Sequence, residues 1–207
     1  MATLALLRKV YGITVDSIII LVPLPRVFDE SKGVICRLFS IIEIMTRVVI
    51  RHGLSEANNR ENVGKLAFAS ADAPLMNIGL EQARDAATVL GETYGMSVFG
   101  EPVATSTMLR TQQTATAMGL RRTMANARLD EVAHGIVLPF VRDLLDRKEL
   151  PEAAIRNAES ILENPPAEGI WVTHGLVIAG LCKVLGVEND EWRFIPRFCE
   201  IRELPID

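Results

Sequence analysis

The chain has 207 residues, with 22 Lys or Arg against 26 Asp or Glu, a formal net charge of −4 and a hydrophobic content of 49%. This composition is typical of a globular protein with room for one sizeable core. The mild acidity argues against a protein whose main partner is nucleic acid, because such proteins carry a clustered basic excess. Any phosphate binding must therefore depend on a local group of positive charges.

The cysteines indicate the redox environment. Cys36, Cys182 and Cys199 are widely spaced, odd in number and include no CxxC pair. This pattern is typical of reduced thiols, so we expect a reducing, cytoplasmic location with neither a disulfide framework nor a zinc ribbon.

The most apolar run of the chain, Ile18–Leu24, lies near the N-terminus between Asp16 and Arg26. A membrane-spanning helix needs about 20 apolar residues, so this run is too short, and its proline disfavours a helix. A signal peptide is disfavoured too, because an acidic residue precedes the run and no small-x-small site follows it. We predict a buried strand or a packed arm, no membrane partner, and an N-terminal extension over residues 1–44 to which the sequence assigns no role.

From Met45 onward strand and helix patterns alternate regularly, which predicts one domain over residues 45–207. The β-branched run Arg47–Ile50 predicts a buried strand, and Asn77 is a good N-cap for an apolar-faced helix that ends at Gly91. The later predicted elements are a strand at Val103–Ala104, helices over Met108–Met118, Pro139–Asp146 and Glu152–Glu163, a strand over Gly169–Thr173, a helix over Leu176–Leu185 and an edge strand over Phe198–Leu204. This alternation predicts an α/β fold with three layers and helices on both faces of the sheet.

Two histidines directly follow predicted strands. Arg51-His52-Gly53 comes after the first strand, and Thr173-His174-Gly175 joins a strand to a helix. Ligands of open α/β sheets bind at this carboxyl edge. Imidazole can act as a nucleophile, guanidinium grips phosphate oxygens, and a helix N-terminus favours an anion. A metal site built from His52, His134 and His174 lacks ligand spacing on any one element, and we do not expect one.

Two further residues fit phosphate chemistry. Arg110 lies in the first turn of a predicted helix, where its charge opposes the helix dipole and a bound phosphate would explain its presence. Glu131, in Leu129-Asp130-Glu131 at a further predicted strand end, is the candidate proton donor to a leaving alkoxide. Asp130 would point to the opposite face of a strand, so the choice between the two carboxylates stays open at this point.

Together these residues resemble the histidine phosphatase superfamily, which includes the phosphoglycerate mutase-like phosphatases. The matching blocks occur in the family's order: Arg51–Asn58, Pro74–Ala83, Ser106–Ala115, Leu129–Glu131 and Val172–Gly175. The resemblance implies a phosphoglycerate mutase-like sandwich around a mainly parallel sheet, and a reaction that needs no metal and no other cofactor. It also implies a role for each candidate: His52 as the nucleophile that becomes phosphohistidine, Arg51, Arg110 and His174 as the phosphate pocket, Glu131 as the acid-base group, and Asn58 with Ser55 as substrate-binding residues.

Departures from the family pattern favour a phosphatase over a mutase. The mutases carry Trp where this chain has Ala57, and a long insertion where this chain has only residues 135–170. Gly175 after His174, in place of Asp, points away from the acid-phosphatase branch. The leading expectation is a metal-independent phosphatase acting on a small phosphorylated metabolite. A phosphoglycerate mutase-type transferase and a non-catalytic phosphate-binding module are the alternatives.

Overall fold

The computed structural model describes residues 17–23, 27–29, 34–36, 39–59, 72–132, 146–187 and 194–206, with side chains from Thr46 onward. The chain divides into two compact units, one made of Met1–Thr46 with Pro205–Asp207 and the other of Arg47–Leu204. Two sequence-based interpretations fall outside the described residues: His134, and the helix over Pro139–Asp146 apart from its last residue.

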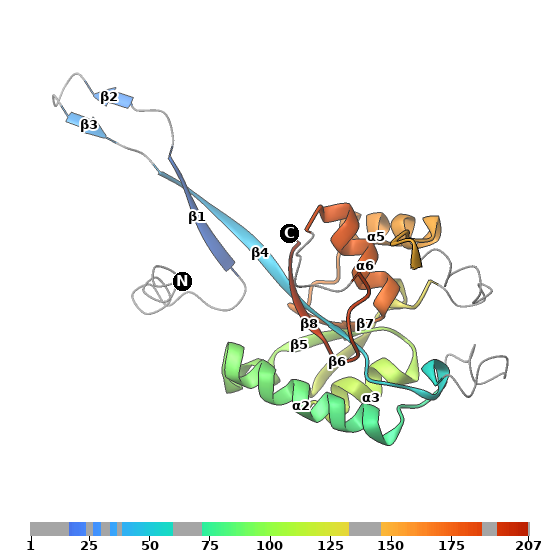
Figure 1. The fold of residues 1–207 in the computed structure, drawn as a ribbon. Coiled ribbons are helices and arrows are strands. Elements are labelled where there is room, and N and C mark those ends of the chain that lie inside the picture. The colour runs from blue at the N-terminus through green and yellow to red at the C-terminus, as the bar shows by residue number, and fades with distance from the viewer. Residues whose placement is uncertain are drawn as a thin grey trace. The chain divides into compact units, whose positions relative to one another are not determined.

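The first unit contains two antiparallel strand pairs (Figure 1). Strand β1 (Ser17–Pro23) pairs with the upstream part of β4 (Phe39–Arg51), with Ser17 opposite Met45. Strands β2 (Val27–Asp29) and β3 (Val34–Cys36) pair with each other. The apolar run near the N-terminus is therefore a strand, as predicted, and β4 begins upstream of the predicted strand.

The second unit is built on a mainly parallel sheet. The downstream part of β4 pairs with β7 (Ile170–Thr173), which pairs with β5 (Pro102–Thr105), which pairs with β6 (Arg122–Ala125), and all three pairings are parallel. Strand β8 (Ile201–Pro205) pairs with β4 and confirms the predicted strand near the C-terminus. Parallel pairing brings the carboxyl ends of these strands to one edge of the sheet.

Helices cover both faces of this sheet. Helices α2 (Asn77–Tyr94) and α3 (Leu109–Ala117) contact each other on one face, and α5 (Glu152–Glu163) and α6 (Gly175–Leu185) pack together on the other (Figure 1). The predicted three-layer α/β fold with helices on both faces of a mainly parallel sheet is thus confirmed. No helix among the described residues is long and apolar enough to cross a membrane.

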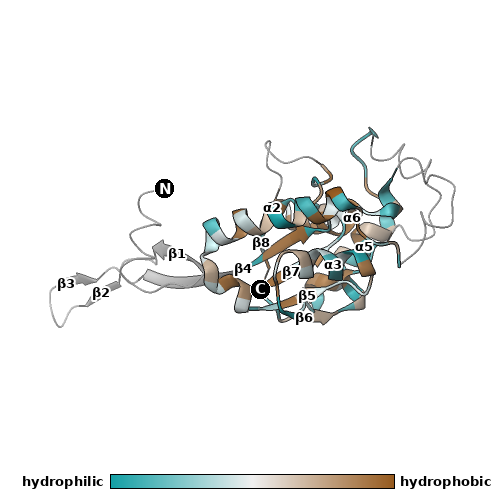
Figure 2. Cartoon of the chain, turned by 90° about the horizontal axis from the view of Figure 1, so that it is seen from below, coloured by the Kyte–Doolittle hydropathy of each residue, from teal (hydrophilic) through white to brown (hydrophobic). Residues whose placement is uncertain are grey.

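The core lies where the sheet meets its helices. All four residues of β7 are buried, and Trp171 is fully buried with its Nε1 donating to the Glu168 carbonyl at 2.6 Å. Figure 2 shows hydrophobic strands that lie between helices with both hydrophilic and hydrophobic residues. Full burial of a large apolar side chain stabilises a fold by about 1.5–3 kcal/mol, so such strands hold the carboxyl edge of the sheet firmly in place.

Both predicted ends of α2 are wrong. The N-cap is Met76 rather than Asn77, and the helix continues past Gly91 to a C-cap at Gly95, whose φ of 83° suits glycine. Gly91 has a packing role instead. A Cβ at Gly91 would lie 3.3 Å from the ring of Phe99, which belongs to the short 3-10 helix η4 (Met96–Gly100).

The predicted strand end at Leu129–Glu131 is also wrong. Leu129 closes a 3-10 turn, η5 (Ala127–Leu129), which Asn126 caps by accepting a hydrogen bond from the backbone N–H of Arg128 at 3.0 Å. The strand that precedes it, β6, was not predicted. All four of its residues are exposed, so no apolar pattern indicates it.

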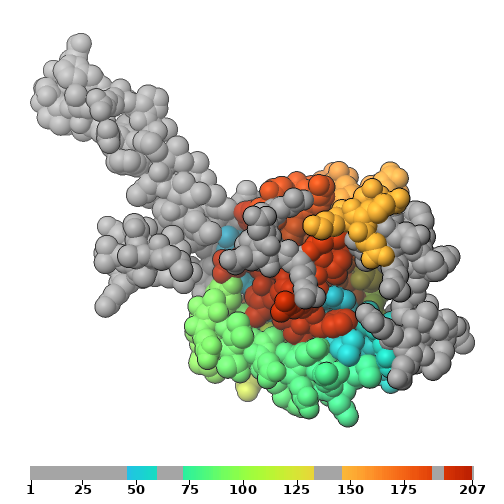
Figure 3. Space-filling model, viewed as in Figure 1, coloured from blue at the N-terminus to red at the C-terminus, as the bar shows by residue number. Residues whose placement is uncertain are grey.

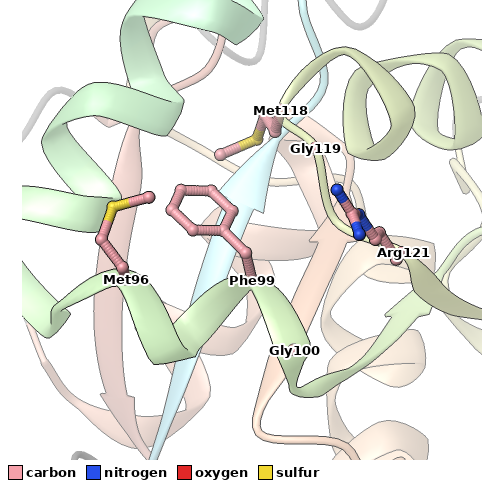
Figure 4. A pocket seen from close by; sticks show the side chains of 6 residues that line it. All are labelled: Met96, Phe99, Gly100, Met118, Gly119 and Arg121. Carbon is pink, nitrogen blue, oxygen red and sulfur yellow. The ribbon is translucent and has the colours of Figure 1, made fainter.

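A hollow of about 440 Å³ lies at the amino ends of β5 and β6 (Figure 4). Its lining residues come from η4 and from the turn before β6: Met96, Phe99, Gly100, Met118, Gly119 and Arg121. It is thus at the opposite end of the strands from the candidate histidines.

A variant that begins at Met45 is expected to fold, because β1 pairs only with residues 39–45 of β4 whereas β7 pairs with residues 48–51. Denaturant unfolding followed by circular dichroism should show one cooperative transition, with the full chain as control. Loss of that transition would mean that residues 1–44 supply part of the core.

Candidate active site

The two histidines meet at the ends of neighbouring strands. Arg51 lies opposite Thr173 in the β4–β7 register, and the backbone N–H of His52 donates to the Thr173 carbonyl at 2.9 Å. The ring centroids of His52 and His174 are 5.0 Å apart, and the residues are 1% and 0% exposed. Two motifs more than a hundred positions apart therefore form one buried pair.

The hydrogen bonding of His52 determines its tautomer. Its Nδ1 lies 2.7 Å from the Gly53 carbonyl oxygen. Because a carbonyl only accepts, Nδ1 must carry the proton and Nε2 the lone pair when the ring is neutral. Burial, reinforced by the charges of Arg51 and Arg110, holds the pKa of His52 well below its usual value of 6.5. At neutral pH the ring is thus an uncharged imidazole, the form that a nucleophile requires.

Arg51 reaches the same edge from the last position of β4. Its Nη1 donates to the Pro196 carbonyl at 2.6 Å, and its Cζ lies 4.0 Å from the centroid of the Phe198 ring. Its Nε is buried without a hydrogen-bond partner among the described residues. Burial lowers the pKa of Arg51 to about 10, against the opposing effect of Glu131, so the guanidinium stays charged at neutral pH.

Arg110 supplies a second buried positive charge. It lies in the first turn of α3, is 5% exposed, and its Nη2 contacts the Met108 sulfur at 2.8 Å. Burial lowers its pKa, and the carboxylates of Glu131 and Asp130 oppose that shift. The carboxylate of Glu131 offsets part of the positive charge of Arg51 and Arg110, and the charge that remains suits a site for an anion.

The two adjacent carboxylates have different surroundings. Asp130 accepts hydrogen bonds from the backbone N–H and the hydroxyl of Thr107, at 2.7 and 2.6 Å. Glu131 instead places Oε2 4.0 Å from Nδ1 of His174. The two side chains point in different directions because Asp130 is hydrogen-bonded to Thr107 near the start of α3, and not because they lie on alternating faces of a strand. Asp130 holds a loop, and Glu131 faces His174.

His174 is the N-cap residue of α6, which begins at Gly175, one residue before the predicted start. Its Nε2 lies 2.8 Å from the hydroxyl oxygen of Ser106, which also accepts from the backbone N–H of Met108 at 3.1 Å. Sequence reasoning did not assign Ser106 a site role. The only signal was its position at the start of a block that resembles the family.

Side chains of α2 and α3 hold the loop that follows His52. The backbone N–H of Gly53 donates to the Thr114 hydroxyl, and that of Leu54 donates to the Gln82 side-chain oxygen, each at 3.0 Å. Thr114 and Gln82 lie in the blocks that resemble the family, but sequence reasoning gave them no role. Through these two hydrogen bonds, α2 and α3 fix the backbone of the loop next to His52.

Ser55 and Asn58 contact each other. The buried Ser55 hydroxyl donates to Oδ1 of Asn58 at 2.8 Å, and Ser55 forms a β-bridge with Leu75. The structure therefore brings together His52, Arg51, Arg110, Glu131 and His174, and places Ser55 and Asn58 in the following loop. Substrate contact by Ser55 and Asn58 stays a prediction.

Gly79 is expected to be essential for this loop. A Cβ at Gly79 would lie 2.1 Å from the Leu54 carbonyl oxygen, closer than any real contact, and both groups are backbone. We expect Gly79→Ala to lower the free energy of unfolding by at least about 2 kcal/mol. Gly100→Ala is the matched control, because nothing lies within 4 Å of its Cβ position. Similar denaturant midpoints for the two variants would contradict this prediction.

The layered fold is that of a phosphoglycerate mutase-like protein. Residues 48–139 match the family model of the histidine phosphatase superfamily, branch 1. The resemblance drawn from the sequence is thereby confirmed over these residues. No curated protein in the comparison matches the chain.

Solved structures share the fold at low sequence identity. The protein TTHB049 from Thermus thermophilus is similar at 20% identity with a TM-score of 0.55, over 77% of this chain and 93% of that one. A phosphoglycerate mutase from the same organism is similar at 22% identity and a TM-score of 0.52, over 79% and 100%. The Rv3214 product of Mycobacterium tuberculosis is similar at 18% identity and a TM-score of 0.51, over 76% and 89%. At these identities the likeness concerns the fold.

Proposed function

We propose that this protein is a metal-independent phosphatase that hydrolyses a phosphomonoester through a phosphohistidine intermediate on His52. The observation that carries the proposal is the tautomer of His52, whose Nδ1 is committed to the Gly53 carbonyl at 2.7 Å. The lone pair on Nε2 is therefore the reactive one. Buried guanidinium groups of Arg51 and Arg110 exert a coulombic effect on this ring, which supports a nucleophile located where a phosphate dianion would bind.

The first half of the reaction transfers the phosphoryl group. The dianion binds among Arg51, Arg110 and the N-terminus of α6, and Nε2 of His52 attacks phosphorus in line with the leaving oxygen. A nitrogen–phosphorus bond forms as the phosphorus–oxygen ester bond breaks, while the Nδ1 proton stays on the ring. The fixed positive charge stabilises the transition state, in which charge spreads over the phosphoryl oxygens.

Glu131 is the proposed acid-base group in both halves. In its protonated form it donates a proton to the leaving alkoxide, and as a carboxylate it accepts a proton from the water that attacks phosphohistidine. Inorganic phosphate then leaves and His52 is restored. The nearby arginines favour the charged carboxylate, and the bound dianion offsets part of their effect.

The substrate and location belong to the same proposal. We expect a small phosphorylated metabolite, with no nucleic acid or membrane as partner. Cys182 and Cys199 are buried free thiols, which suits a reducing compartment such as the cytoplasm.

A panel of small phosphomonoesters tests the proposal by the release of inorganic phosphate, measured with and without a metal chelator. We expect release from at least one ester at the same rate in both conditions. A stable phosphoenzyme that releases no phosphate would instead support a mutase. Phosphate binding without any turnover would support a non-catalytic phosphate-binding module.

A further inference from the structure

We infer that Phe198 is a positioning residue that orients Arg51 for phosphate, an inference that rests on the proposed function. Phe198 belongs to the segment Pro196–Glu200, which we term the clasp. The clasp lies outside the part of the chain that matches the family model and outside every block that carries the sequence resemblance. Its contacts with Arg51 therefore add a feature that the motifs do not contain.

The clasp holds the backbone of Arg51 on both sides of the residue. The backbone N–H of Arg51 donates to the Glu200 carbonyl at 3.1 Å, and the N–H of Cys199 donates to the Arg51 carbonyl at 3.0 Å. Figure 3 shows the cyan segment that follows β4 beside the red C-terminal part of the chain. The main chain of Arg51 is thus fixed by residues far away in the sequence.

The clasp also holds the guanidinium group. Nη1 donates to the Pro196 carbonyl at 2.6 Å, and the Phe198 ring lies with its centroid 4.0 Å from Cζ, within the range of a cation–π contact. The same ring is 6.0 Å from the ring of His52, centroid to centroid. Phe198 therefore borders both the proposed nucleophile and its neighbouring arginine.

These contacts leave a defined edge of the guanidinium for a ligand. Nη1 donates its hydrogen bond to the Pro196 carbonyl, and Cζ lies over the Phe198 ring. Nε, in contrast, is buried without a hydrogen-bond partner among the described residues. The start of α6 borders Nε, since a Cβ at Gly175 would lie 3.2 Å from it. A planar guanidinium binds two phosphate oxygens only if its plane is oriented correctly. Phe198 supplies that orientation.

The backbone of the clasp supports a specific role. Cys199 is a buried non-glycine residue with φ of 58°, in the left-handed region that L-residues rarely adopt. Such a conformation is unfavourable and persists where surrounding contacts enforce it. Here the turn lets consecutive residues, Phe198 and Cys199, contact the guanidinium and the carbonyl of the same arginine.

A double-mutant cycle tests this inference on the full chain with an aryl phosphate. In the native protein, we expect Phe198→Leu to lower kcat/KM about tenfold. In the Arg51→Lys variant, Phe198→Leu should have almost no further effect, because the lysine side chain has no planar group to orient. Phe198→Tyr, which keeps an aromatic ring at this position, should have a kcat/KM close to that of the native protein. Arg197→Ala is the matched control, since that side chain is an exposed part of the same clasp and should leave kcat/KM unchanged.

Affinity for orthovanadate, measured by calorimetry on the same variants, gives a second readout that needs no turnover. The same non-additive loss of affinity supports the positioning role even if the chain proves not to be a phosphatase. Equal losses from Phe198→Leu in both Arg51 backgrounds overturn it, and would show that Phe198 acts independently of Arg51. A chain that neither binds vanadate nor turns over an ester overturns both the inference and the proposed function.

Discussion

Replacing His52 by alanine is expected to lower phosphate release by roughly 1,000-fold or more, because no other group inherits its attack on phosphorus. Residual activity would come from the charged pocket, which remains. The His52 side chain is buried, so the folding of the variant must be checked by its unfolding transition. Near-normal turnover by a folded His52→Ala protein would rule out the proposed nucleophile.

Trapping the intermediate is the second arm of the same prediction. A phosphorus–nitrogen bond is labile in acid and stable in alkali, unlike a serine phosphate. An alkaline quench during turnover of a radiolabelled ester should therefore leave label on a peptide that contains His52, and none on the His52→Ala protein. Label that maps to His134 or to a serine would place the chemistry elsewhere.

The parts of the site that were predictable are those encoded by local sequence. His52 and His174 each follow a run of apolar residues, and both runs are buried strands that pair with each other. The carboxyl ends of parallel strands share an edge, so two strand-end motifs suffice to place two histidines together. Arg110 was found similarly, since a cation in the first turn of a helix needs a specific reason.

The parts that were missed depend on contacts between distant segments. The exposed strand β6 has no apolar alternation, so its position became clear only from its pairing with β5. The hydrogen bonds of Asp130 to Thr107 distinguish it from Glu131, and no local pattern encodes them. The contacts of Phe198 with Arg51 join segments at opposite ends of the domain, which periodicity cannot relate.

Glu131→Gln is expected to have an effect that depends on the leaving group. Glutamine keeps the size of the side chain but cannot donate the proton that a departing alkoxide needs, so transfer from an alkyl phosphate should slow about 100-fold or more. An aryl oxide leaves with little help, so the same variant should transfer the phosphoryl group from an aryl phosphate at a rate close to that of the native protein. The rate of the first turnover, measured by rapid quench for both esters, isolates this step from the later hydrolysis of phosphohistidine.

Asp130→Asn is the matched control for the assignment of the acid, because Asp130 lies next to Glu131 and is bonded to Thr107. The loss of a charged acceptor there should lower stability and leave the ratio of alkyl to aryl rates near the native value. An equal slowing of both esters by Glu131→Gln would mean that Glu131 shapes the pocket without donating a proton. A changed ratio in Asp130→Asn alone would transfer the role of the acid to Asp130.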